Sequence, residues 1–230
     1  EAELEARKKQ YEFYRNKLLT PVEENGKWMM NGEEVEWRPL GKIGSCYAGA
    51  TPRTGIYEYW ENGTIQWMSS GEVNKGRIYE TEKKITQIAY DKCSTKMVPL
   101  NTVVIALAGQ GKTRGKVAIT KTALCTNQSL CSLVIDNENI NNDYVYYYLS
   151  TQYQNLRSIS SGDGTRGGLN LQMIKNYKIP LPSINDQRHI VSILDKFDSL
   201  VNDISIGLPA EIEARRKQYE YYRNRLLSFK

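Results

Sequence analysis

The chain opens with a hydrophobic stripe whose spacing predicts a helix of the coiled-coil type. Leu4, Tyr11, Tyr14 and Leu18 stand at the a and d intervals of a heptad, and Arg7 takes the missing position. We therefore expect a short N-terminal helix within residues 1–20 that pairs with another helix along this stripe.

A second stripe runs through the end of the chain in alternating steps of four and three residues. It consists of Ile190, Leu194, Phe197, Val201, Ile204, Leu208, Ile212, Arg215, Tyr219, Tyr222 and Leu226. An extra four-residue step falls at Gly207-Leu208-Pro209, which predicts a kink or break there. Ser183-x-x-Asp186 predicts the capping box that begins the helix. About 40 residues at ~1.5 Å each would form a rod on the order of 60 Å long.

The two ends of the chain are copies of each other. Residues 2–19 and 210–227 match at an offset of 208, with 14 of 18 positions identical. The four differences keep side-chain size and charge type, so both copies should do the same physical job. A rod this long needs a partner helix, either the N-terminal copy or another chain. The alternative is a helix that lies on the surface of its own domain.

Between the two ends, from residue 21 to 182, the hydrophobic period shortens to about two and Gly/Asn/Thr turns appear. This pattern predicts strands at Thr64–Met68, Val103–Leu107, Lys116–Ile119, Leu130–Ile135 and Tyr177–Ile179. Asn142 or Asp143 should cap a helix that runs on towards Leu156-Arg157, and residues 169–174 should add a short helical turn.

These patterns predict an α+β fold. It is a mixed α/β domain over residues 21–182, with a short N-terminal helix over 1–20 and a long C-terminal coiled-coil helix over 183–230. The helix-pairing residues are Leu4, Tyr11, Tyr14, Leu18, Ile190, Leu194, Phe197, Val201, Ile204, Tyr219, Tyr222 and Leu226.

Three loops of the middle domain, at residues 49–55, 108–116 and 160–168, combine Gly with Arg or Lys and with hydroxyl or amide side chains. Gly lets a backbone approach closely, Arg and Gln suit base edges, and Lys suits phosphate. One such loop is ordinary for a solvated turn, but three in one domain favour nucleic-acid contact. The predicted DNA-facing residues are Arg53, Thr54, Gln110, Lys112, Thr113, Arg114, Lys116, Thr165 and Arg166.

Two further features bear on this site. Ser69, Ser70, Glu72, Asn74 and Lys75 form another polar loop that could join it. For Trp60 and Trp67, a place in the core is favoured over base stacking.

Residues 106–113 resemble a phosphate-binding P-loop, because they read Ala-x-x-x-x-Gly-Lys-Thr after an apolar strand. A P-loop needs a helix directly after its Lys, whose amide groups hold the phosphates. Residues 114–120 instead read as a turn and a strand, and Ala106 replaces the first Gly. The pattern therefore disfavours an ATP site.

Composition excludes several classes of protein. The 230 residues carry a net charge of +5, a weak indication of an anionic partner. No apolar run is long enough to span a membrane, and the acidic start of the chain is unlike a secretory signal. His189 stands alone and the four Cys form no Cys-x-x-Cys pair, which disfavours a metal site and suits a reducing cytoplasm.

The sequence contains no recognisable catalytic constellation. It has no Gly-x-Ser-x-Gly motif, and Gly44-Ser45-Cys46 has no obvious base beside it. It also has no Asn-Pro-Pro-Tyr-like box, which an adenine methyltransferase would need for its flipped base. We therefore expect a protein that reads nucleic acid and catalyses nothing.

Several motifs together resemble the DNA-specificity subunit of type I restriction–modification enzymes. They are residues 49–52 with 59–67, residues 109–116 with 126–128, residues 176–182, residues 186–195, and the Lys-Gln-Tyr-Glu-x-Tyr-Arg-Asn-x-Leu-Leu ending found in both terminal copies. The resemblance covers most of the chain.

The resemblance implies a role without catalysis. Members of this family are expected to hold two target-recognition domains, each reading one half of a bipartite site, with long conserved helices as a ruler between them. They are expected to bind double-stranded DNA and to dock modification subunits and restriction subunits. The partner subunits would carry the cofactors: S-adenosylmethionine for adenine methylation, and ATP and Mg²⁺ for restriction.

This chain departs from that plan because it carries one recognition domain. The resemblance then implies a half-subunit, and two copies joined through their helices would restore the two-fold arrangement. We expect a cytoplasmic homodimer that reads a palindromic bipartite site and has no membrane contact. A coiled-coil adaptor without DNA specificity and a P-loop-like nucleotide-binding protein are the alternatives.

Overall fold

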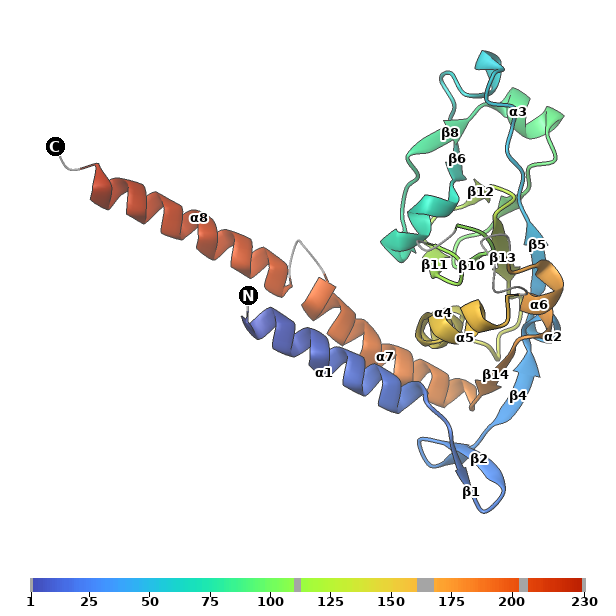
Figure 1. Cartoon of the computed structure of the whole chain (residues 1–230), viewed down its shortest axis with the longest axis horizontal. Helices are drawn as coiled ribbons and strands as arrows, with labels where there is room; N and C mark the ends of the chain where they lie inside the picture. The colour runs from blue at the N-terminus through green and yellow to red at the C-terminus, as the bar shows by residue number, and fades with distance from the viewer. Residues whose placement is uncertain (1, 110–112, 161–167, 203–206, 229–230) are drawn as a thin grey trace.

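A computed structural model describes residues 2–109, 113–160, 168–202 and 207–228. A mixed α/β unit lies at one end of the molecule, and a helical arm projects from it (Figure 1). This arrangement confirms the predicted fold class. No helix within these ranges is long and apolar enough to cross a lipid bilayer.

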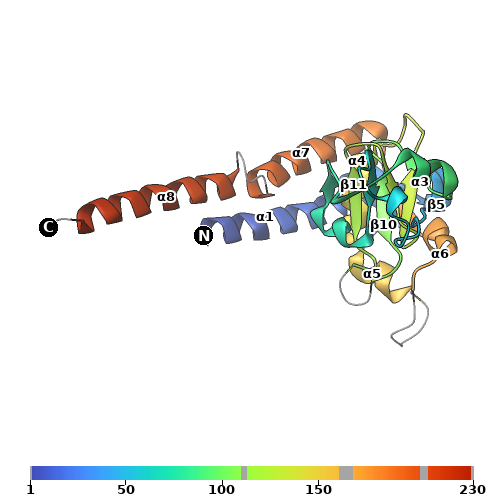
Figure 2. The ribbon, with the colours of Figure 1, turned by 90° about the horizontal axis from the view of Figure 1, so that it is seen from above.

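The helical arm has three members. Helix α1 (Ala2–Leu19) lies antiparallel beside α7 (Ile184–Asn202), and α8 (Leu208–Leu227) extends beyond them (Figures 1 and 2). The amide of Asp186 donates to Ser183 Oγ over 3.3 Å, so Ser183 caps α7 as predicted. Gly207 has an extended backbone (φ −85°, ψ −171°) and Pro209 stands in the first turn of α8, so the predicted break is confirmed.

The centre of the α/β unit is a five-stranded sheet in the order β5 (Ser45–Ala48), β13 (Leu130–Val134), β10 (Val103–Ala106), β11 (Val117–Thr120) and β7 (Arg77–Ile78). Neighbouring strands are antiparallel, except that β7 runs parallel to β11. Along β10, Val103 and Ile105 join one hydrophobic cluster, and Val104 and Ala106 join another. Both faces of this sheet are therefore covered.

Helices cover the first of these faces. The cluster containing Val103 includes Tyr144 and Leu149 of α4 (Asn142–Thr151), and it continues into Leu194 of α7 and Tyr11 of α1. The helical arm thus shares its core with the α/β unit. Three further helices pack around this unit: α5 (Tyr153–Ser158), α6 (Leu171–Asn176) and α2 (Leu40–Ile43).

A four-stranded sheet packs towards the second face, in the order β8 (Lys83–Ile85), β6 (Ile65–Met68), β12 (Leu124–Thr126) and β9 (Met97–Val98). Two 3₁₀ helices, η1 (Tyr57–Tyr59) and η2 (Ser70–Lys75), and helix α3 (Gln87–Lys92) accompany it. Near α7, β14 (Lys178–Leu181) pairs with β4 (Glu36–Pro39).

A three-stranded sheet follows α1, formed by β1 (Val22–Glu24), β2 (Lys27–Met30) and β3 (Glu33–Glu34). Its two turns are Asn25-Gly26 and Asn31-Gly32, and all four residues have positive φ. Asn-Gly adopts this backbone with little strain, and the resulting turn matches the twist of a hairpin.

The five strands predicted from the sequence are present, with ends shifted by up to two residues. The predicted cap of α4 was wrong by one residue, and the helix expected to run on towards Arg157 ends at Thr151, with α5 beginning at Tyr153. Asn141 is the cap, because its side chain accepts a hydrogen bond from the amide of Tyr144 over 3.1 Å. Asn142 and Asp143 are already helical, and their side chains bind Asn101 and Arg77 instead.

Candidate nucleic-acid interface

The predicted polar loops gather at one end of the five-stranded sheet, where its strands begin or terminate. Strand β13 is antiparallel to β5 and β10, so the end of β5, the start of β13 and the end of β10 share that end. Loop 1 (residues 49–55) leaves it after β5, and loop 2 (residues 108–116) leaves it after β10. We call this end of the sheet, with loops 1 and 2 and the turn at 127–129, the loop edge.

Hydrogen bonds tie these segments to one another. The amide of Ala50 donates to Thr126 O over 2.9 Å, and the Thr51 hydroxyl donates to Gln128. On the other side, the amide of Leu107 donates to Ser129 O over 2.9 Å. The turn at residues 127–129 therefore stands between loops 1 and 2.

The described residues that flank 161–167 lie beside loop 2; the segment from 160 to 168 is called loop 3, and residues 161–167 are outside the described ranges. Arg114 Nη1 donates to Ser160 Oγ over 3.2 Å, and the amide of Leu169 donates to Leu107 O over 3.1 Å. Within the described residues, the structure thus brings together loop 1, the ends of loop 2 and the start of loop 3. The turn at 127–129 entered the sequence argument only as part of a motif, and its position between the loops follows from strand pairing.

Two tryptophans hold loop 1 in place. Trp67 Nε1 donates to Ala50 O over 3.0 Å, and Trp60 Nε1 donates to Arg53 O over 3.2 Å. The two rings pack edge to face, with centroids 5.0 Å apart. Trp67 is buried, which confirms its predicted place in the core, while Trp60 is half-buried. Arg53 and Thr54 are consequently displayed on the surface.

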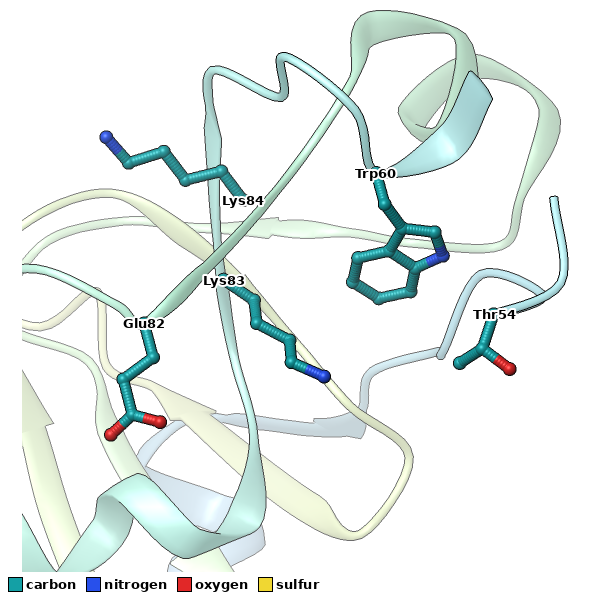
Figure 3. A pocket seen from close by; sticks show the side chains of 5 residues that line it. All are labelled: Thr54, Trp60, Glu82, Lys83 and Lys84. Carbon is teal, nitrogen blue, oxygen red and sulfur yellow. The ribbon is translucent and has the colours of Figure 1, made fainter. Parts of the chain in front are cut away.

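A cationic pocket of about 370 Å³ adjoins loop 1 (Figure 3). Thr54, Trp60, Glu82, Lys83 and Lys84 line it. Lys83 extends towards Trp60, with its Nζ 5.8 Å from the ring centroid, and Lys84 leaves the strand on the other side. Sequence reasoning missed both lysines because they belong to a three-residue strand, β8, and not to a glycine-rich loop.

In loop 2, one of the residues predicted to face DNA instead forms a hydrogen bond within the loop. Thr113 is buried and its hydroxyl donates to Ala108 O over 3.1 Å, so its assignment as DNA-facing was wrong. Arg114 and Lys116 are half-buried. Lys116 Nζ donates to Asn74 Oδ1 over 2.7 Å, which brings η2 to the same edge.

The polar residues of η2 divide into two roles. Glu72 is buried and accepts hydrogen bonds from the amides of Ser69 and Glu82, both over 2.9 Å. Its hydrogen bond to Lys75, together with nearby Glu82, raises the pKa of Lys75. Glu72 therefore organises the turn, and Asn74 is the member that faces loop 2.

Four predicted DNA-facing residues, Gln110, Lys112, Thr165 and Arg166, lie outside the described residues. For the P-loop-like segment, residues 113–115 form a turn and β11 follows as a strand. A phosphate-binding helix therefore does not follow this turn, as the sequence indicated.

The predicted helix-pairing residues separate into two groups. Tyr14 stacks on Phe197 with ring centroids 5.6 Å apart, and Tyr11 lies 6.4 Å from the same ring. Burial and the nearby Asp198 raise the pKa of Tyr11. Leu4, Leu18, Ile190 and Leu194 belong to the same cluster.

In contrast, Tyr219, Tyr222 and Leu226 of α8 are exposed. Val201 lies in α7 but its side chain is not described, and Ile204 lies outside the described residues.

The thiols and the histidine give no sign of a metal centre. Among the described residues, no group of three or more His, Cys, Asp or Glu side chains is placed to hold a metal ion. Cys46, Cys125 and Cys131 are buried free thiols, Cys93 is half-buried, and His189 is exposed. Burial raises the pKa of Cys125 to about 11.

Comparison with known proteins shows that the chain matches a protein family. The model of the type I restriction modification DNA specificity domain matches residues 32–214. The specificity subunit of the Escherichia coli type I restriction enzyme EcoR124I/EcoR124II is 40% identical over 232 residues, which cover 99% of this chain and 54% of that protein. The chain thus spans about half the length of the curated relatives it matches.

Solved structures share the fold. An HsdS subunit from Thermoanaerobacter tengcongensis superposes with a TM-score of 0.61 at 19% identity, over 89% of this chain and 46% of that one. A chain from a structural study of complex assembly in a type I R-M system reaches 0.68 at 21% identity, over 95% of this chain and 50% of that one.

Proposed function

Because the chain belongs to the type I restriction–modification DNA specificity family, we propose that it reads one half of a bipartite site in double-stranded DNA through its loop edge. It takes no part in the chemistry itself. Recognition is its contribution to a type I restriction–modification complex.

The observation that carries this proposal is the convergence of the polar segments. Loop 1, the described parts of loop 2, Ser160 at the start of loop 3, the turn at 127–129 and η2 lie far apart in the sequence and are joined by hydrogen bonds at one end of the sheet. Arg53 and Thr54 are exposed there, on a loop that two indole groups hold in shape. A preformed set of Arg, Thr and amide side chains suits base edges, because such contacts depend on fixed geometry.

The cationic pocket supplies a second kind of contact. Lys83 and Lys84 are exposed, and Lys83 lies over the Trp60 ring beside loop 1. Lysine ammonium groups bind backbone phosphates, which position a protein on the duplex without reading its sequence. We assign these lysines to the phosphates that flank the half-site.

Selection from a pool of random duplexes, followed by titration of the selected site at several salt concentrations, tests this function. We expect an enriched sequence and a binding constant that falls steeply with salt. Lys83→Ala should make the negative slope of log K against log salt concentration less steep by about 0.9, the value for one phosphate contact. The sequence preference should not change. Lys178→Ala, an exposed lysine of β14 away from the loop edge, is the control.

Equal affinity for all duplexes, or no salt dependence, would count against specific DNA recognition. Either result would favour the coiled-coil adaptor, whose helices need no DNA.

The helical arm supports a second part of the proposal, pairing with a further copy of the chain. Helix α8 repeats the sequence of α1, and α1 is packed on α7. A helix with the same side chains should fit the same groove, so α8 of one copy would dock on α7 of another. The resulting homodimer would present two α/β units, which we call recognition units, to a palindromic bipartite site.

Analytical ultracentrifugation at micromolar concentration tests this pairing. We expect a dimer, and a stable species of 26.4 kDa, the mass of one chain, would contradict it.

The remaining partners follow from the family. Relatives of this chain are named as specificity subunits of type I restriction enzymes, so we propose that it docks modification and restriction subunits. Those subunits would bring S-adenosylmethionine, ATP and Mg²⁺. A DNA substrate and free thiols support a cytoplasmic location.

A further inference from the structure

Arg77 lies where the recognition unit meets the helical arm. It stands in β7, the edge strand of the five-stranded sheet, and its side chain is 18% exposed. Nη1 donates to Asp143 of α4 over 2.8 Å, and Nη2 donates to Asp195 of α7 over 2.6 Å. One guanidinium therefore joins the sheet, the helix that covers it and the helix of the arm.

The neighbours of Arg77 strengthen this junction. Asp198 of α7 is within 3.5 Å of Nε, and the Tyr147 hydroxyl, which accepts from Nη2 over 2.8 Å, donates to Asp195 over 2.7 Å. The guanidinium also lies 5.5 Å from the Tyr146 and Tyr147 ring centroids. Arg provides a rigid planar fork here, which a Lys ammonium cannot reproduce.

The same strand leads directly to the loop edge. Asn74, which binds Lys116, is three residues before Arg77, and the intervening Gly76 carbonyl accepts from the amide of Ile119 over 2.8 Å. A rotation of the recognition unit on α7 would move these groups together with β7. The contacts of Arg77 with Asp195 and Asp198 oppose that rotation.

We propose that Arg77 is a positioning residue that fixes the orientation of the recognition loops on the helical arm, and thereby the gap length that a bipartite site must have. The inference rests on the proposed function, since gap length has meaning only for a protein that reads two half-sites. Arg77 itself touches no DNA in this scheme.

Arg77→Lys tests the inference because it keeps the charge and loses the fork. Asp195→Asn is a second variant, and it removes a half-exposed carboxylate of α7 while leaving Arg77 its contact with Asp143. Arg38→Lys is the matched control, because Arg38 forms an exposed ion pair with Glu36. Thermal unfolding of each variant confirms that it is folded.

The first measurement needs no DNA. Spin labels are placed on cysteines introduced at Tyr57, in the recognition unit, and at Lys196, on α7, in a full chain with Cys93→Ser. Double electron–electron resonance should give a narrow distribution of the distance between the two labels for the parent and for Arg38→Lys. It should give a broader one for Arg77→Lys and Asp195→Asn. An unchanged distribution in both variants would overturn the inference.

The second measurement compares affinity for the selected site with affinity for sites whose gap is one base pair longer or shorter. In Arg77→Lys the preference for the correct gap should fall about tenfold, the equivalent of one charged hydrogen bond. Affinity for an isolated half-site should not change.

Broader distances with an unchanged gap preference would also overturn the inference. Failure of the parent chain to select any sequence would instead count against the proposed function, so the two failures can be told apart.

Discussion

At the scale of single residues, the shape of the loop edge rests on close contacts that leave little freedom. Gly49 begins loop 1 against strand β12, and a Cβ there would lie 1.8 Å from Thr126 O. Trp67 and Trp60 then bind the backbone of the same loop through their indole groups. The side chains that we propose to meet DNA are thus positioned by residues that do not themselves need to touch it.

Gly49→Ala should displace loop 1, because no side chain fits between this backbone and Thr126. We expect a stability loss of about 1–3 kcal/mol, as in an overpacked core, together with weaker sequence-specific binding. Gly55→Ala is the control in the same loop, since a Cβ there has no heavy atom within 4 Å. Chemical denaturation and DNA titration measure both effects, and equal behaviour of the two variants would refute the explanation.

The thiols give a pH-dependent prediction. The pKa of Cys125 is raised to about 11 by burial, so its reactive thiolate should be scarce at pH 8. Half-buried Cys93 should therefore be alkylated first, and labelling of Cys125 should accelerate towards pH 10. In the unfolded chain the Cys125 thiol has a pKa of about 8.5, below its folded value, so the stability that the protonated thiol contributes at neutral pH is lost as the pH rises towards 11. Peptide mapping by mass spectrometry follows each site, and simultaneous labelling of both at pH 8 would contradict this.

At the scale of elements, long periodic segments could be predicted from the sequence and short ones could not. The heptad stripes of α1 and α7 and the apolar run of β10 carry their own pattern. Strand β7 has two residues and β8 has three, too few to show a period. Their places are set by pairing with β11 and β6, which is a property of the folded chain.

The site shows the same division. Loops 1, 2 and 3 could be proposed as a site from the sequence because Gly next to Arg or Lys is unusual when repeated three times in one domain. Lys83 and Lys84 escaped because they lie in a strand, and Arg77 because its partners are 66 and 118 residues away. Thr113 was misjudged because composition does not tell an exposed hydroxyl from one that binds its own loop.

The pairing of α1 with α7 depends on one aromatic side chain more than on any polar contact. Phe197→Ala removes the ring on which Tyr14 stacks and which Tyr11 approaches. Because Phe197 is half-buried, the cost should be about half of the ~3–5 kcal/mol typical of a buried Phe. Limited trypsin digestion should then cleave α1 faster than in the parent. Phe13→Ala removes an exposed ring of α1 that meets Tyr14 edge to face, and it should change the rate much less; equal rates for both variants would exclude this role.

At the scale of the whole molecule, one sequence is used in two environments. In α1, Tyr11 is 8% exposed because it packs on α7, whereas its copy in α8, Tyr219, is 66% exposed. Figure 2 shows α8 extending past the end of α1, clear of the recognition unit. The face of α7 is therefore already occupied by α1, which has nearly the same sequence as α8. Helix α8 of a second copy must compete with α1 for this face.

This competition predicts opposite effects for the same substitution at the two copies. Tyr219→Ala should weaken self-association about tenfold, since a buried Tyr anchor at an interface contributes more than 1 kcal/mol. Tyr11→Ala should instead strengthen it, because α1 loosens and its place on α7 becomes available to α8 of another chain. Sedimentation over a range of concentrations gives the dissociation constants, and circular dichroism shows whether the helices persist. If both substitutions change the constant in the same direction, α1 and α8 do not share a groove, and pairing of the two copies must use another face of the arm.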